Sequence, residues 1–163
     1  RERVDDVVSV SDSEMSVALT LLAERAKTVV ETAGAAPVAA LLSGAVDVDD
    51  EHVAAVVSGG NVNLTEHGEL ARAGLMELDR YADVDVAVAD WPTGVGSVTE
   101  VVESRGAELD VLERTRRTAA DDPNRTPVRL GVEGSGADHL QSVVDALDAL
   151  DGVTVTSHSL GRD

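Results

Sequence analysis

The order of apolar periodicities in the second half of the chain restricts its fold more than any other feature. Val84, Val86 and Val88 alternate with polar or small residues, which is typical of a half-buried strand. The segments that follow read, in chain order, as helix 98–106, strands 109–115 and 128–132, helix 137–150 and strand 153–155. This βαββαβ order predicts a small antiparallel sheet backed by two helices.

Helical patterns dominate the first half. Ser11 and Glu14 have the spacing of a capping box, so we expect an amphipathic helix over about 12–28. Two further helices are expected at 37–43 and 65–78, the first of them after a hinge of small residues at 31–37. The fold class predicted for the whole chain is therefore α/β.

The pattern changes near residues 79–82, which predicts two domains, 1–80 and 81–163. A loosely alternating run at 4–10 reads as a short strand or extended entry to the first domain. The 163 residues are enough for either domain to bury an apolar core.

The apolar run 53–57 ends abruptly at Ser58, Gly59, Gly60 and Asn61. A β-branched run that stops at small polar residues and glycines predicts a buried strand followed by a tight loop. In open α/β sheets, ligands bind just beyond the carboxyl end of such a strand. The alternative is an ordinary turn in which Asn61 caps a neighbouring element.

The chain is strongly acidic, with 31 acidic residues, 13 basic residues and a net charge of −18. Nucleic acid is excluded as a partner, because its binding requires clustered positive charge. A folded chain with one Lys and no Phe is typical of a halophilic, haloarchaeal-type protein from a high-salt cytoplasm, where salt screens carboxylate repulsion. We expect a cytoplasmic protein that has no membrane span, because charged residues interrupt every apolar stretch.

No metal site and no catalytic residue are predicted. Thiolate ligands are absent because the chain has no Cys. Ser97 lacks the Gly-x-Ser-x-Gly elbow of a hydrolase nucleophile. The histidines are scattered, without metal-ligand spacing to a carboxylate: His52, His67, His139 and His158.

Four motifs of the first half, in their order and spacing, resemble the carboxyl-terminal portion of threonine ammonia-lyases (threonine dehydratases), which are pyridoxal-phosphate enzymes of fold type II. The motifs are Val4-Asp5-Asp6-Val7, Leu22-Ala23-Glu24-Arg25-Ala26-Lys27, Val30-Glu31 with Ala33-Gly34-Ala35, and Val57-Ser58-Gly59-Gly60-Asn61-Val62-Asn63-Leu64. The second half resembles ACT-like regulatory domains through its element order, through Asp90-x-Pro92-x-Gly94 and through Gly106-Ala107-Glu108.

The resemblance implies a role in converting L-threonine to 2-oxobutanoate and ammonia, within isoleucine biosynthesis, with pyridoxal 5'-phosphate as cofactor. By resemblance, Ser58 is the partner of the pyridine nitrogen, and a neutral hydroxyl makes the ring a milder electron sink that suits β-elimination. Gly59 and Gly60 would let the backbone approach the ring, Asn61 completes the loop, and Glu31 would lie near the same pocket.

The family's Schiff-base lysine and phosphate-binding glycine loop are not in this sequence. The single lysine, Lys27, matches a helix-surface position of the family instead. We therefore expect the chain to be a carboxyl-terminal fragment that is catalytically incomplete by itself.

Two alternatives remain open. One is a stand-alone ACT-type regulatory protein without enzyme activity, which forms a homo-oligomer through its ACT-like domain. Its amino-acid effector would bind at Asp90, Pro92, Gly94 and Gly96. The other is a non-functional remnant whose first helices lack packing partners and aggregate.

Overall fold

A computed structural model describes residues 4–161. It divides the chain into two compact units, with the boundary between Leu78 and Asp79. Each unit is built around its own cluster of buried apolar side chains. No helix in the described part of the chain has both the length and the apolar content that crossing a membrane requires.

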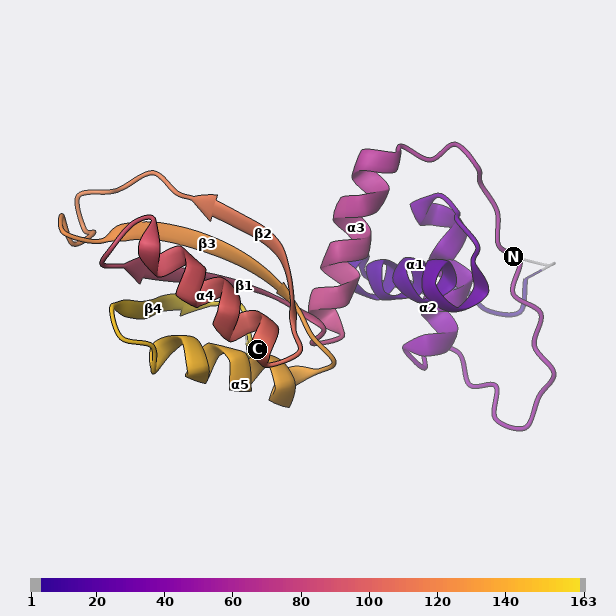
Figure 1. Ribbon diagram of the computed structural model, residues 1–163. Helices are drawn as coiled ribbons and strands as arrows, with labels where there is room; N and C mark the ends of the chain where they lie inside the picture. The colour runs from indigo at the N-terminus through magenta and orange to yellow at the C-terminus, as the bar shows by residue number, and fades with distance from the viewer. Residues whose placement is uncertain (1–3, 162–163) are drawn as a thin grey trace. The chain divides into compact units, whose positions relative to one another are not determined.

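The second unit is a four-stranded antiparallel sheet with two helices. Its elements are β1 (Tyr81–Val88), α4 (Thr93–Ser104), β2 (Glu108–Arg114), β3 (Thr126–Glu133), α5 (Ala137–Asp148) and β4 (Val153–His158). The strand order is β2-β3-β1-β4, and all neighbouring strands are antiparallel. Figure 1 shows α4 and α5 on the same face of this sheet. The predicted βαββαβ order and the ACT-like fold are therefore confirmed.

The alternation in β1 determines which face of the sheet is covered. Val84, Val86 and Val88 are each 1% exposed and belong to the core that α4 and α5 close. Asp83 and Asp85, at the intervening positions, are only half-buried, because successive strand residues point to opposite faces. The face away from the helices is therefore polar.

The first unit is helical, with α1 (Asp12–Ala26), the 3₁₀ helix η1 (Thr32–Ala35), α2 (Ala36–Leu42) and α3 (Leu64–Glu77). The predicted capping box is confirmed, because Ser11 N–H donates to Glu14 and Glu14 N–H donates to the Ser11 hydroxyl. The segment expected as a small-residue hinge forms the 3₁₀ helix η1. Its small residues pack closely: Gly34 and Ala35 are buried.

The strand expected at 53–57 is not formed, and this prediction was wrong. The run 4–10, expected as a short strand or an extended entry, forms no strand either. Both segments are irregular, and no neighbouring strand pairs with them within residues 4–161. Val56 is 77% exposed and Val7 is 84% exposed. A β-branched run becomes a strand only when another strand satisfies its backbone N–H and C=O groups. Figure 1 shows a long segment without helix or strand between α2 and α3.

Candidate functional site

The loop at Ser58 lies against the turn that precedes α2. A Cβ on Gly34 would come within 1.7 Å of the Ser58 carbonyl oxygen and 2.8 Å of its carbonyl carbon. Backbone atoms cannot yield as a flexible side chain does, so Gly34 is required for this approach. The Gly34 N–H donates to the Glu31 carbonyl at 2.9 Å, which fixes the turn.

Gly59 forms the second contact between the loop and this turn. The Glu31 N–H donates to the Gly59 carbonyl oxygen at 3.0 Å. Gly59 has φ +87°, in the left-handed region, and a Cβ there would lie 2.1 Å from Glu31 Cγ. Two residues that are 28 positions apart in the sequence, Glu31 and Gly59, are therefore neighbours in the first unit.

A cavity of about 260 Å³ adjoins this contact. Glu31 and Asn61 lie in its wall, so two of the predicted site residues line one hollow. The remaining lining residues come from the turn and from the start of α3: Val30, Thr32, Ala33, Val62, Asn63, Glu66, His67 and Leu70. Among all the lining side chains, two are carboxylates, Glu31 and Glu66, and none is Lys or Arg, so the hollow itself does not favour a phosphate group.

The Ser58 side chain is exposed, and its hydroxyl forms no hydrogen bond within residues 4–161. A hydroxyl both donates and accepts, so it is able to pair with an aromatic ring nitrogen. Nothing lies within 4 Å of a Cβ built on Gly60, so the backbone at Gly60 is open to a ligand. These residues fit the pyridine ring of pyridoxal phosphate, but they offer no cation for its phosphate.

Lys27 lies away from this hollow. It is the C-cap of α1, with φ 54° and ψ 32°, and its ammonium group donates to the Glu24 carbonyl oxygen. The structure therefore pairs Lys27 with a carbonyl at the end of its helix. A cation is favourable there because the free carbonyls at a helix end carry partial negative charge.

The predicted effector residues of the second unit form the tight turn that begins α4. The Gly94 N–H donates to the Asp90 carbonyl at 2.6 Å, and Pro92 is the N-cap of the helix. A Cβ on Gly94 would come 2.4 Å from Val88 Cγ1, whereas Gly96 faces open space. The turn places Asp90, Pro92, Gly94 and Gly96 together in one short segment.

Two residues of the first site were not identified from the sequence. Gly34 was assigned to the small-residue hinge, and no local signal in the sequence marks it as a point of close backbone approach. Asn63 is the N-cap of α3, because its side chain accepts from Thr65 N–H at 3.1 Å. Asn61, which was weighed as a capping residue, lines the hollow instead.

Within residues 4–161, no group of three or more His, Asp or Glu side chains is arranged to hold a metal ion. The site in the first unit therefore consists of a hydroxyl, a carboxylate, an amide and two close-packed glycines. The class of protein follows from both units. It is an α/β protein in which a unit with a candidate ligand-binding loop is followed by an ACT-like domain.

No protein-family profile matches the chain. It is 32% identical over 151 residues to the L-threonine ammonia-lyase of Geobacter sulfurreducens, a match that covers 92% of this chain and 37% of the relative. The L-threonine ammonia-lyase of Thermotoga maritima is 29% identical over 149 residues, which cover 91% of this chain and 37% of the relative. A catabolic L-threonine dehydratase of Staphylococcus aureus is 44% identical over 79 residues, covering 47% of this chain and 23% of the relative.

Among solved structures, a homoserine dehydrogenase from Thiobacillus denitrificans is 17% identical, with a TM-score of 0.37, and the match covers 50% of this chain and 17% of that one. The sequence relatives are the informative comparison. The chain is similar to the L-threonine ammonia-lyases along about nine-tenths of its length, and it matches their carboxyl-terminal portion. It spans 37% of the length of the first two relatives.

Proposed function

We propose that this chain is part of a pyridoxal-phosphate-dependent L-threonine ammonia-lyase, which converts L-threonine to 2-oxobutanoate and ammonia. In this proposal the enzyme is cytoplasmic and halophilic, supplies isoleucine biosynthesis and assembles as a homo-oligomer through its ACT-like domain. The observation that carries the proposal is the similarity to L-threonine ammonia-lyases along 92% of the chain.

The geometry of the Ser58 loop supports this role. In the proposal, the free hydroxyl of Ser58 pairs with the cofactor's pyridine nitrogen, and Gly59 and Gly60 leave room for the ring. The contact between Glu31 and Gly59 holds the loop in position, and Asn61 faces the adjoining hollow. The bound cofactor would supply the electron sink for β-elimination, and a neutral hydroxyl partner keeps that sink mild.

The first unit also carries the apolar surface expected of a piece of a larger domain. Nine of the ten exposed large apolar side chains among the described residues belong to it: Val4, Val7, Val8, Val29, Leu42, Val46, Val53, Val56 and Leu64. Isolated exposed apolar residues are ordinary, but a concentration of them in one small unit marks a surface that another polypeptide covers. We propose that the rest of the lyase covers it and supplies the lysine and the phosphate cradle.

A chimaera tests the proposal. The matching segment of the Geobacter relative is replaced by this chain, and 2-oxobutanoate release from L-threonine is measured with pyridoxal phosphate present. We expect activity in the chimaera, and we expect Ser58→Ala to lower turnover several-fold, up to about tenfold, the effect of losing a neutral hydrogen bond of about 0.5–1.5 kcal/mol.

The matched control is Ser104→Ala, because Ser104 is an exposed serine of α4 whose hydroxyl donates only to the Val101 carbonyl of its own helix. It should leave turnover unchanged. A folded chimaera without activity, or equal turnover in the Ser58→Ala and parent chimaeras, would contradict the assignment. So would a covalent adduct on Lys27, detected by absorbance after pyridoxal phosphate is added to the chain alone.

The second unit supports a second candidate function, amino-acid sensing. Its βαββαβ fold is complete, with a closed core, and does not depend on the first unit's site. In this reading a branched-chain amino acid binds near Asp90, Pro92, Gly94 and Gly96. Calorimetry of the full chain with isoleucine and with valine tests it, and the absence of heat at millimolar ligand would contradict it.

A further inference from the structure

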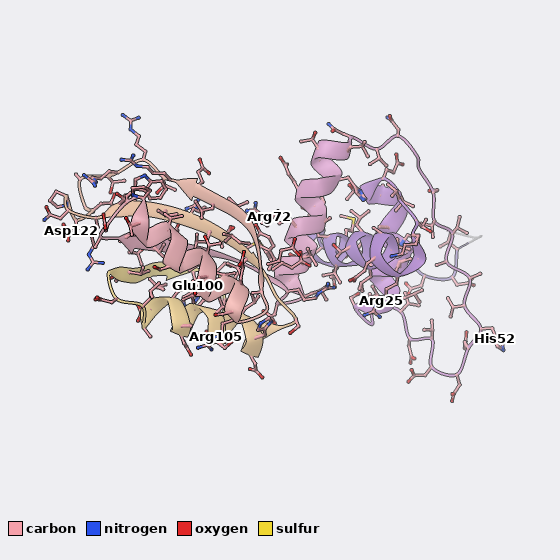
Figure 2. All side chains as sticks on the ribbon, viewed as in Figure 1. Arg25, His52, Arg72, Glu100, Arg105 and Asp122 are labelled. Carbon is pink, nitrogen blue, oxygen red and sulfur yellow. The ribbon has the colours of Figure 1, made fainter. Side chains whose placement is uncertain are left out.

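The polar face of the second unit's sheet carries a cavity of about 520 Å³. Its floor is formed by β1, β3 and β4, and its wall is the β2–β3 loop, residues 115–125. Asp122, labelled in Figure 2, belongs to that loop. The cavity lies on the sheet face opposite α4 and α5, so it is separate from the turn of Asp90 and Gly96.

Arg125 attaches the loop to the sheet. Its Nη1 donates to Thr154 Oγ1 at 3.0 Å. The same atom donates to the carbonyl oxygens of Ala87 and Gly152 at 3.3 and 3.4 Å. Arg117, on the same loop, donates to the Arg125 carbonyl oxygen. The wall is therefore held by hydrogen bonds to two strands and to the residue before β4, and the cavity is preformed.

Each of the three carboxylates in the lining already has partners. Asp85 accepts two hydrogen bonds from Arg129, at 2.9 and 3.2 Å, and a third from Ser157 at 2.9 Å. Asp121 accepts from both the backbone N–H and the hydroxyl of Thr118. These two bonds hold the pKa of Asp121 below its usual value, so it remains ionised.

Asp122, the third carboxylate, accepts from Asn124 N–H at 2.8 Å and lies 3.8 Å from Arg125 Nε. Arg116 differs from all of these charged groups. It is exposed and lines the cavity, and its side chain has no hydrogen bond or ion pair within residues 4–161. In a chain with a net charge of −18, a cation without a partner beside a preformed cavity is available to an anionic ligand.

We propose that this cavity, here named the sheet-face cavity, binds a small organic carboxylate, with the Arg116 guanidinium as its anchor. A guanidinium binds a planar carboxylate through two parallel hydrogen bonds. The Thr115 side chain offers a further polar contact, and Ala120 and Pro127 provide small apolar surface for a short carbon chain. The volume is within the range of small-molecule sites.

Both α-amino acids and 2-oxo acids present this carboxylate, and the test separates them. The full chain is titrated calorimetrically with L-isoleucine, with 2-oxobutanoate and, as a comparison anion, with inorganic phosphate. Backbone amide shifts are recorded in parallel. We expect saturable binding of at least one carboxylate, with shifts at Arg116, Ala120 and Thr154 rather than at 90–96.

Arg116→Gln should weaken this binding about tenfold or more, which corresponds to the loss of a charge-assisted bond. The matched control is Arg114→Gln, which removes the same charge two residues away. Arg114 lies over the Trp91 ring, 5.9 Å from its centroid, and does not line the cavity. This variant should change the dissociation constant less than twofold.

Three results would overturn the proposal. The first is no binding of either carboxylate to the parent chain. The second is equal weakening by Arg116→Gln and Arg114→Gln, which would indicate general electrostatic attraction. The third is phosphate binding as tight as carboxylate binding at the same site, which would indicate an unselective anion site. None of these outcomes depends on ammonia-lyase activity, so this inference and the proposed function fail separately.

Discussion

The two units differ in how completely they bury their own apolar side chains. In the second unit, the strand valines and the leucines of α5 meet in one closed core, and Leu112 is its only exposed large apolar side chain among the described residues. The first unit buries a smaller cluster around Ala18 and Leu19 and leaves nine large apolar side chains exposed. A closed core indicates an independent fold, and an open one indicates a missing neighbour.

The difference arises from strand pairing rather than from composition. The runs at 84–88 and at 53–57 are both rich in valine. The first has strands on both sides, β3 and β4, whereas the second has none within residues 4–161. The same residue type therefore forms a core strand in one unit and an exposed irregular segment in the other.

The largest effect is expected from a change in the closed core. Leu130, on β3, is 0% exposed, so Leu130→Ala should lower the free energy of unfolding of the second unit by about 2–5 kcal/mol. Leu112→Ala, on β2, removes the same atoms at a side chain that is 37% exposed and should cost about 1 kcal/mol or less. Urea unfolding followed by the fluorescence of Trp91, the single tryptophan, measures both. Equal losses would show that the core is not closed.

Packing in the first unit is tested by two glycines of α3. A Cβ on Gly74 would lie 2.2 Å from Thr20 Oγ1 and 2.3 Å from the Ser16 carbonyl oxygen of α1. Gly74→Ala should therefore force the helices apart and cost about 1–3 kcal/mol. Gly68 has nothing within 4 Å of such a Cβ, so Gly68→Ala should stabilise α3 by up to about 1 kcal/mol. Amide hydrogen exchange in α1 and α3 gives both values, and opposite signs are the expected result.

A smaller effect on stability is expected at the exposed run. Val56 is 77% exposed, so Val56→Ser should change the free energy of unfolding of the chain by less than about 0.5 kcal/mol. It should nevertheless reduce self-association, which sedimentation velocity measures, because it removes apolar surface from the open unit. A loss of several kcal/mol would show that the run is buried and that the two units do not differ as described.

The smallest effect is expected at the start of α1. Hydrogen bonds from the Ser11 backbone and then from the Ser11 hydroxyl lower the pKa of Glu14 from its ordinary value of 4.5. A lowered carboxylate pKa stabilises the fold above the unfolded pKa, and this contribution is lost as pH falls through the folded pKa. NMR titration of the Glu14 carboxyl should give the lowered pKa, and Ser11→Ala should raise it. No change on that substitution would contradict the capping box.

For the candidate site, the sequence identified the loop and, by resemblance, Glu31, but it did not identify Gly34 or Asn63. Small residues that follow an apolar run can be recognised from the sequence alone, and this is how Ser58, Gly59 and Gly60 were identified. The contact of Gly34 with Ser58 depends on how two distant segments pack, and no local pattern encodes that. The sheet-face cavity was missed for the same reason, since its walls come from three strands and a loop.

By itself, the sequence determined the βαββαβ order, the capping box of α1 and the resemblance to threonine ammonia-lyases, because periodicity and local hydrogen-bonding residues are properties of short segments. Only the tertiary structure decided that 53–57 has no strand partner, that Glu31 meets Gly59, and that Arg116 is left without a carboxylate. These outcomes depend on which groups far apart in the chain come together. Only the folded structure determines which polar groups of the side chains and the backbone find hydrogen-bond partners.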